Sequence, residues 1–134
     1  LGNALETTGA AAHLGRGLVS IAGDDPFVLL AVTYLTVMVL TELITNVAAA
    51  MLMLPLVLAI TASAGLNDAP YVLAVMMAAS ASFATPIGYQ CNLMVYGPGG
   101  YRFSDFFRIG IPMNLLCFVV TVVTIPVFWP LTGG

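Results

Sequence analysis

Residues 26–62 decide the fold of this chain, and they read PFVLLAVTYLTVMVLTELITNVAAAMLMLPLVLAITA. Two apolar runs, 26–40 and 47–60, flank a polar stretch that contains Thr41, Glu42, Thr45 and Asn46. A helix over the first run would be about 22 Å long, which is shorter than the ~30 Å hydrocarbon core of a bilayer. A straight helix over the whole segment would extend about 55 Å, much more than that core. The pattern therefore favours a re-entrant helical hairpin over 26–62 with its tip at 41–47, and one long helix with a polar belt is the alternative.

The composition of the chain predicts that lipid is its solvent. Of its 134 residues, 60% are hydrophobic and 7% are charged, whereas soluble domains carry roughly 25% charged residues. The chain has three basic residues and a net charge of −3, so it lacks the basic face that nucleic-acid binding requires. We therefore expect an all-α integral membrane protein, a multi-pass protein of the cell membrane (inner or plasma membrane), without a nucleic-acid partner.

The segment before the hairpin is more polar. Residues 1–23 are expected to form an interfacial or connecting helix. Asp25 can cap the helix that follows, with Pro26 at its first position. The chain begins at Leu1 within a helical pattern, and no signal peptide is visible. We therefore expect residues 1–134 to be the C-terminal transmembrane repeat of a larger protein, whose N-terminal half is missing here.

Residues 71–100 are expected to form a broken transmembrane helix. The first part, 71–85, is apolar, and small residues recur at every fourth position, which suits close helix packing; they are Ala74, Ala78 and Ser82. The helix should end at 85–88, where the sequence is Thr-Pro-Ile-Gly. Residues 96–101 should then form a loop, because they include three glycines and a proline.

Residues 109–130 are expected to form the final transmembrane helix. The run Ile109–Phe128 is apolar and twenty residues long, and Trp129 suits the aromatic belt at a membrane surface. Arg102 and Arg108 flank the preceding loop, which predicts that this loop is cytoplasmic. The hairpin would then open from the outside.

Nearly all polar groups at membrane depth lie at the two interruptions. Broken helices build ion sites in transporters, because unwound carbonyl groups coordinate a small cation and half-helix N-termini attract an anion. The neutral side chains available for this purpose are Thr41, Thr45, Asn46, Thr85 and Asn92. Their oxygens suit a hard cation such as sodium. The alternative is that these groups only form hydrogen bonds between helices.

Glu42 is the only ionisable residue deep within the apolar region. An acid at that depth is a functional candidate, as a proton carrier or as an aid to a cation site. It is equally compatible with a hydrogen-bonded tip residue that faces a water-filled cavity. The sequence has no cysteine–histidine pair, paired acids or metal-spaced cluster, so enzyme activity is not expected.

Two stretches resemble the divalent anion/sodium symporters, also called the sodium/sulfate or sodium/dicarboxylate symporters. Residues 79–95, ASASFATPIGYQCNLMV, are similar to the signature stretch of that family. Residues 41–50, TELITNVAAA, are similar to its second hairpin tip, which usually contains Ser-Asn-Thr. The resemblance implies the second inverted repeat of an elevator-type, sodium-driven secondary transporter, commonly a homodimer.

The resemblance also implies a role for individual residues, with sodium as the only metal. One sodium ion would be ringed by Thr41, the Ile44 carbonyl, Asn46 and the Ala84 carbonyl. The anion would be faced by Thr45, Asn46, Thr85 and Pro86. Supporting roles would fall to Glu42, Gly88 and Asn92. Thr45 replaces the family's serine and keeps its hydroxyl, whereas Val47 replaces a threonine and loses one.

The segment 88–101 is similar to the sulfate-type branch of the family, which favours sulfate or a similar inorganic divalent anion as substrate. A dicarboxylate such as succinate is the first alternative. Arsenite or sodium/proton exchange, with Glu42 as the carrier, is the second. A membrane scaffold without transport is the third.

Overall fold

The computed structural model describes residues 9–132, and this part of the chain is helical with no strand. It contains α2 (Ala10–Ala22), α3 (Pro26–Leu43), α4 (Asn46–Ala64), α5 (Asp68–Ser80), α6 (Gln90–Tyr96) and α7 (Phe103–Phe128). Three of these, α3, α4 and α7, are long and apolar enough to cross a membrane. The predicted all-α membrane fold is therefore confirmed. The first part of the expected interfacial helix, residues 1–8, lies outside the described residues.

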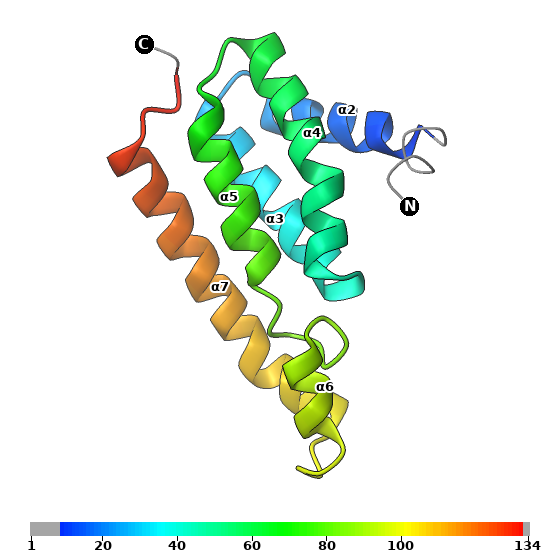
Figure 1. The fold of residues 1–134 in the computed structure, drawn as a ribbon. Coiled ribbons are helices and arrows are strands. Elements are labelled where there is room, and N and C mark those ends of the chain that lie inside the picture. The colour runs from blue at the N-terminus through cyan, green and yellow to red at the C-terminus, as the bar shows by residue number, and fades with distance from the viewer. Residues whose placement is uncertain (1–8, 133–134) are drawn as a thin grey trace.

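α3 and α4 form an antiparallel hairpin (Figure 1). Asp25 caps α3 through a 3.0 Å hydrogen bond from the Phe27 N–H, and Pro26 occupies the first helical position, as predicted. Thr45 caps α4, because its hydroxyl oxygen accepts the Ala48 N–H at 3.3 Å.

The turn of the hairpin is tighter than the sequence predicts. α3 continues to Leu43 and α4 begins at Asn46, so Ile44 and Thr45 alone join them. The expected tip at 41–47 was therefore too wide. The two helices have 18 and 19 residues, which makes each about 27–29 Å long. Whether the hairpin is re-entrant stays a prediction.

The helix interruption begins earlier than predicted. α5 ends at Ser80, whereas the sequence placed the end at 85–88, and residues 81–89 are irregular before α6 starts. The reason is tertiary: the N–H groups of residues 83–85 bond to side chains of α3 and α7 instead of carbonyls of their own helix. Helix propensity depends on the local sequence alone, so it carries no information on such distant partners.

α7 is longer than the predicted final helix. It begins at Phe103, after the Arg102 N–H donates to Asp105 Oδ2 at 2.8 Å, and it ends before Trp129. Its 26 residues extend about 39 Å. Pro112 consequently lies inside the helix and not in its first turn.

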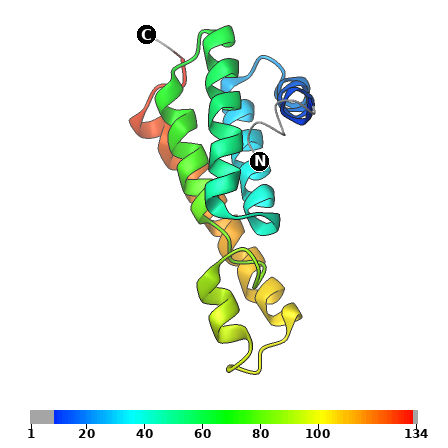
Figure 2. The ribbon, with the colours of Figure 1, turned by 45° about the vertical axis from the view of Figure 1, so that its right-hand side comes forward.

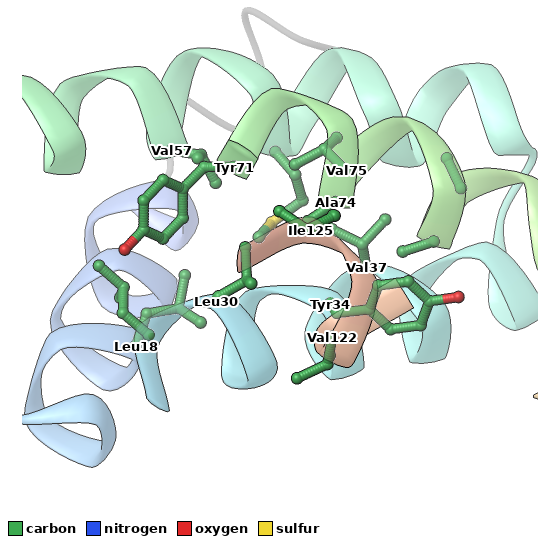
Figure 3. Close-up of a cluster of buried hydrophobic side chains, with 14 of the residues drawn as sticks. Leu18, Leu30, Tyr34, Val37, Val57, Tyr71, Ala74, Val75, Val122 and Ile125 are labelled. Atoms are coloured by element: carbon green, nitrogen blue, oxygen red, sulfur yellow. The ribbon is translucent and has the colours of Figure 1, made fainter. Parts of the chain in front are cut away.

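The helices α2, α3, α4, α5 and α7 enclose one apolar core (Figure 3). Its largest fully buried side chains include Tyr34, Tyr71 and Leu30. Ala74 and Ala78 are both fully buried on α5, as the small-residue pattern predicts. α2 is seen nearly end-on in Figure 2, across the direction of the hairpin, and Gly15 allows its close approach to Leu56 of α4.

The segment after α7 is tied back to the α4–α5 turn. The Asn67 N–H donates to the Leu131 carbonyl at 3.1 Å, and Asn67 Nδ2 donates to the Pro130 carbonyl at 3.2 Å. An isolated antiparallel bridge joins Leu66 and Thr132. These contacts fix the end of α7 against the open end of the hairpin (Figure 1).

Candidate functional site

The tip of the hairpin lies against the interruption between α5 and α6. Thr41, which is fully buried in the last turn of α3, donates from its hydroxyl to the Ala79 carbonyl at 3.0 Å. Ser82 returns a hydrogen bond from its hydroxyl to the Thr41 carbonyl at 3.3 Å. The two polar interruptions seen in the sequence, 38 to 41 residues apart, thus form one site.

The carboxylate of Glu42 is the centre of this contact. Its Oε1 accepts the Ala84 N–H at 2.9 Å, and its Oε2 accepts the Thr85 N–H at 2.8 Å. Asn114 of α7 donates from Nδ2 to the same Oε1 at 2.7 Å. Asn114 also accepts the Phe83 N–H through Oδ1, at 3.4 Å.

These bonds explain how the backbone can be irregular at this depth. The N–H groups of three successive residues, 83 to 85, have no helical acceptor, and an unpaired backbone group in an apolar environment is costly. Glu42 and Asn114 supply the missing acceptors. Glu42 is therefore a hydrogen-bonded residue that ties the hairpin tip to the interruption.

Thr41 and Asn46 face each other across the hairpin turn, with 2.7 Å between the Thr41 hydroxyl oxygen and Asn46 Oδ1. The hydroxyl has one proton, and the Ala79 carbonyl also accepts from it. Both contacts are satisfied together when the Asn46 amide is turned, so that Nδ2 donates to Thr41. The Asn46 carbonyl oxygen then points away from Thr41 and keeps its lone pairs for another partner.

The two main-chain candidates for sodium lie at the same junction. Ile44 directly follows Leu43, the last residue of α3, and its backbone is extended. Ala84 is buried between Glu42 and α7. Within residues 9–132, neither carbonyl oxygen accepts a hydrogen bond. The four predicted sodium ligands, Thr41, Ile44, Asn46 and Ala84, are thus brought into one region.

The predicted anion-facing residues differ in what their hydroxyl groups can do. Thr45 uses only an oxygen lone pair, to cap α4, so its proton remains available at the exposed N-terminus of that helix. Thr85 donates its proton to the Glu42 carbonyl at 3.1 Å and accepts the Gly88 N–H at 3.1 Å. Thr85 must release that first bond to donate to an anion. Pro86 is buried next to it.

Asn92 and Gly88 support the interruption from the other end. Asn92, on α6, donates from Nδ2 to the carbonyls of Ser82 and Thr85, at 3.3 and 3.2 Å. A Cβ atom on Gly88 would stand 1.9 Å from the Ser82 hydroxyl oxygen and 3.1 Å from the Thr41 carbonyl. Only glycine therefore allows residues 82 and 88 to approach this closely.

Two residues of the site escaped the sequence analysis. Ser82 was noted only as a small packing residue, although its hydroxyl joins the interruption to Thr41. Asn114 was read as part of the apolar run 109–128, although it is 5% exposed and bonded to Glu42. A buried amide in an otherwise apolar membrane helix is itself a signal of a polar partner.

The site contains no set of ligands for a transition metal. Among the described residues, no group of three His, Cys, Asp or Glu side chains could hold a metal ion. The donors that gather here are hydroxyl, amide and carbonyl groups, which suit a hard, monovalent cation better than zinc or iron.

Comparison with known proteins agrees with this chemistry. A family model described as "Citrate transporter" matches residues 1–132. The uncharacterised transporter sll0640 of Synechocystis is 44% identical over 122 residues, which cover 90% of this chain and 20% of that protein. Sodium/sulfate cotransporter 2 of Chlamydomonas reinhardtii is 38% identical over 120 residues, covering 87% of this chain and 14% of that protein. The sodium-dependent dicarboxylate transporter SdcS of Staphylococcus saprophyticus is 29% identical over 125 residues, which cover 93% of this chain and 24% of that protein.

The chain spans only 14% to 24% of the length of these three relatives. All three relatives are named as transporters and none as an enzyme. The resemblance to the divalent anion/sodium symporters is confirmed as well, because sodium/sulfate and sodium/dicarboxylate transporters are among the relatives. The match of the family model over nearly the whole length establishes that this chain belongs to the citrate transporter family.

Proposed function

We propose that this chain forms one half of the binding site of a sodium-coupled transporter for a divalent anion, with sulfate as the favoured substrate. The observation that carries the proposal is the junction of the α3–α4 tip with the α5–α6 interruption, which Glu42 holds together through the N–H groups of Ala84 and Thr85. Half-helix ends that meet inside a membrane protein can coordinate a cation and an anion side by side.

The sodium ion would lie between the two interruptions. Its ligands would be the Thr41 hydroxyl oxygen, the Asn46 amide oxygen and the carbonyl oxygens of Ile44 and Ala84. Thr41 and Asn46 face each other across the hairpin turn, and the two carbonyls have no competing hydrogen bond among the described residues. Four neutral oxygens next to a carboxylate form a favourable environment for a small cation.

The anion would lie at the N-terminus of α4. The first N–H groups of a helix lack partners and carry a partial positive charge, which favours an anion there. Thr45 adds a hydroxyl proton, and Asn46 adds an amide group when the sodium ion takes its oxygen. Thr85 and Pro86 would contact the anion from the interruption.

We favour sulfate because the sodium/sulfate cotransporters among the relatives have a higher identity to this chain than SdcS has. Three sodium/sulfate cotransporters of Chlamydomonas reinhardtii, one of them named as probable, are 36% to 38% identical to this chain, whereas the dicarboxylate transporter SdcS is 29% identical. A dicarboxylate is the second candidate, because the SdcS match covers 93% of this chain. Proton exchange through Glu42 has less support, since both of its carboxylate oxygens are engaged by hydrogen-bond donors.

The remaining expectations belong to the same proposal. The chain would be the second inverted repeat of an elevator-type transporter, and the first repeat would complete the site. The whole protein would be a homodimer in the cell membrane, with lipid around the exposed apolar faces of α3, α4 and α7.

The test uses the full-length transporter reconstituted in liposomes. An inward sodium gradient should drive uptake of labelled sulfate, and an equal potassium gradient should not. Excess succinate should compete weakly. Sodium-driven uptake of labelled succinate, with no uptake of sulfate, would replace sulfate by a dicarboxylate. Uptake that is equal in the two gradients would contradict sodium coupling altogether.

A further inference from the structure

Asn114 connects the long helix α7 to both halves of the candidate site. It is 5% exposed, and its amide group makes two hydrogen bonds. Nδ2 donates to Glu42 Oε1 at 2.7 Å, and Oδ1 accepts the Phe83 N–H at 3.4 Å. The orientation of the amide is determined by these partners, because a carboxylate cannot donate and a backbone N–H cannot accept.

We propose that Asn114 is a positioning residue, which acts through Glu42 to set the distance between the α3–α4 tip and the α5–α6 interruption, and thereby the affinity for sodium. The proposal rests on the proposed function, because it assumes that Ala84 and Thr41 are sodium ligands. Asn114 itself would contact neither the cation nor the anion.

The position of the Glu42 carboxylate depends on its hydrogen-bond partners. Its side chain has several rotatable bonds, and the N–H groups of Ala84 and Thr85 belong to an irregular segment that has no rigid helix of its own. Asn114 adds a third contact from a continuous helix, so the Glu42 carboxylate is held against a rigid element.

A second contact of α7 lies one helical turn earlier, on the same face. Gly110 is buried, and a Cβ atom there would stand 2.1 Å from the Phe83 carbonyl oxygen and 2.4 Å from Ala84 Cα. α7 therefore touches the backbone of residues 83 and 84 directly, and it holds Glu42 through Asn114. Ala84 is fixed from two sides, and its carbonyl is one of the proposed sodium ligands.

Cation coordination is sensitive to such positioning, because a site of fixed ligands selects a cation by its cavity size and by the geometry of its oxygens. Replacing Asn114 with leucine, which has a similar volume, removes both hydrogen bonds. We expect the sodium half-saturation to rise about tenfold, the factor that corresponds to one lost hydrogen bond to a charged group. Maximal uptake at saturating sodium should change much less, because every proposed ligand is still present.

Asn67 provides a matched control. Its Oδ1 accepts the Ala69 N–H at 3.2 Å and its Nδ2 donates to the Pro130 carbonyl at 3.2 Å, so its amide also makes one bond as acceptor and one as donor, but to neutral backbone groups and away from the site. Asn67→Leu should lower the melting temperature of the transporter and leave the sodium half-saturation unchanged. Asn114→Leu should change the half-saturation.

The mechanism through Glu42 is tested by a double-mutant cycle in the full-length transporter. Glu42→Met removes the acceptor of the Asn114 hydrogen bond, so Asn114→Leu should add little to the sodium half-saturation concentration in a Glu42→Met background. Asn114→Ser serves as a second variant if the leucine protein is not obtained. Sodium-induced stabilisation against heat gives the affinity without transport.

The positioning role would be overturned if both Asn114 variants kept the wild-type sodium concentration for half-maximal uptake. It would also be overturned if the effects in the double-mutant cycle were fully additive. Neither result would affect the proposed function. Absence of sodium-driven uptake and of sodium-induced stabilisation in the wild-type protein would overturn both. A rise in half-saturation in the Asn114 variants, together with a coupled cycle and an unchanged Asn67→Leu protein, would support the inference.

Discussion

Gly110 of α7 lies so close to Phe83 that a Cβ atom at position 110 would stand 2.1 Å from the Phe83 carbonyl oxygen. Real Cβ atoms do not approach an oxygen to this distance, and the neighbouring atoms are backbone, which cannot rotate away. The absence of a side chain at residue 110 therefore allows α7 to lie against the interruption after α5.

Gly110→Ala should destabilise the transporter and shift the interruption away from α7. Overpacking of this kind costs about 1–3 kcal/mol. Thermal unfolding of the purified full-length protein measures the loss. Gly17→Ala is the control, because nothing lies within 4 Å of its added Cβ and α2 continues through it. Alanine there should stabilise the helix by about 0.5–1 kcal/mol. Equal melting temperatures for the two variants would contradict the contact.

Asn46→Ala should abolish sodium-coupled uptake and leave expression nearly normal. The substitution removes the amide oxygen proposed as a sodium ligand and the amide donor proposed for the anion. A hydrogen bond or contact to a charged group is worth about 1.5–3 kcal/mol, which corresponds to roughly ten- to a hundredfold in affinity. Sodium-dependence curves on purified protein give the result. An unchanged half-saturation with unchanged maximal uptake would exclude Asn46 as a ligand.

Thr45→Val should raise the Michaelis constant for the anion, and Thr45→Ser should leave it close to the wild-type value. Valine has nearly the same shape as threonine but no hydroxyl, so it removes both the proposed donor to the anion and the cap of α4. The cap alone is worth about 1 kcal/mol of stability, and a melting curve detects that part. If valine lowers the melting temperature without changing the Michaelis constant, Thr45 is only a cap.

Cysteine labelling tests whether the α3–α4 hairpin is re-entrant. Single cysteines at Asp24 and Ala64, at the open end of the hairpin, should react with an impermeant reagent from one side of the membrane. A cysteine at Pro98, in the loop between α6 and α7, should react from the other side. A cysteine at Ile44, at the turn, should react poorly with a bulky impermeant reagent from either side.

The natural cysteines, Cys91 and Cys117, must first be replaced by serine, because Cys91 is exposed. Cysteines at Ile44 and Pro98 that react equally well from the same side would mean that α3 and α4 each cross the whole membrane. Both helices are long enough for that arrangement.

The sequence located the hairpin because its polar turn interrupts an apolar run, a signal that depends only on local composition. It misplaced the start of α7 because Ser104, Asp105 and Arg108 look like loop residues, although they occupy the first two turns of the helix. It also missed the early end of α5. The N–H groups of residues 83–85 leave the helix for partners on α3 and α7, and local propensity carries no information on them.

The residue types of the candidate site could be predicted, but their connections could not. Thr41 and Asn46 lie five residues apart, so a turn brings them together. Glu42 and Asn114 are 72 residues apart, and their contact depends on how α7 packs against the hairpin. The sequence therefore left the role of Glu42 undecided.

The tie between residues 130–132 and the α4–α5 turn has a mechanical consequence. α7 is attached to the rest of the molecule at two points. Asn67 holds the segment that follows its C-terminal end, and Gly110 and Asn114 hold its first half against the site. The turns of α7 before Gly110 extend beyond the second point of attachment and lie beside α6 (Figure 2). Pro112 lies at this second point of attachment, and it removes the backbone hydrogen bond to the Arg108 carbonyl because proline has no N–H. We expect α7 to bend at Pro112, which would move the turns before Gly110 relative to the hairpin.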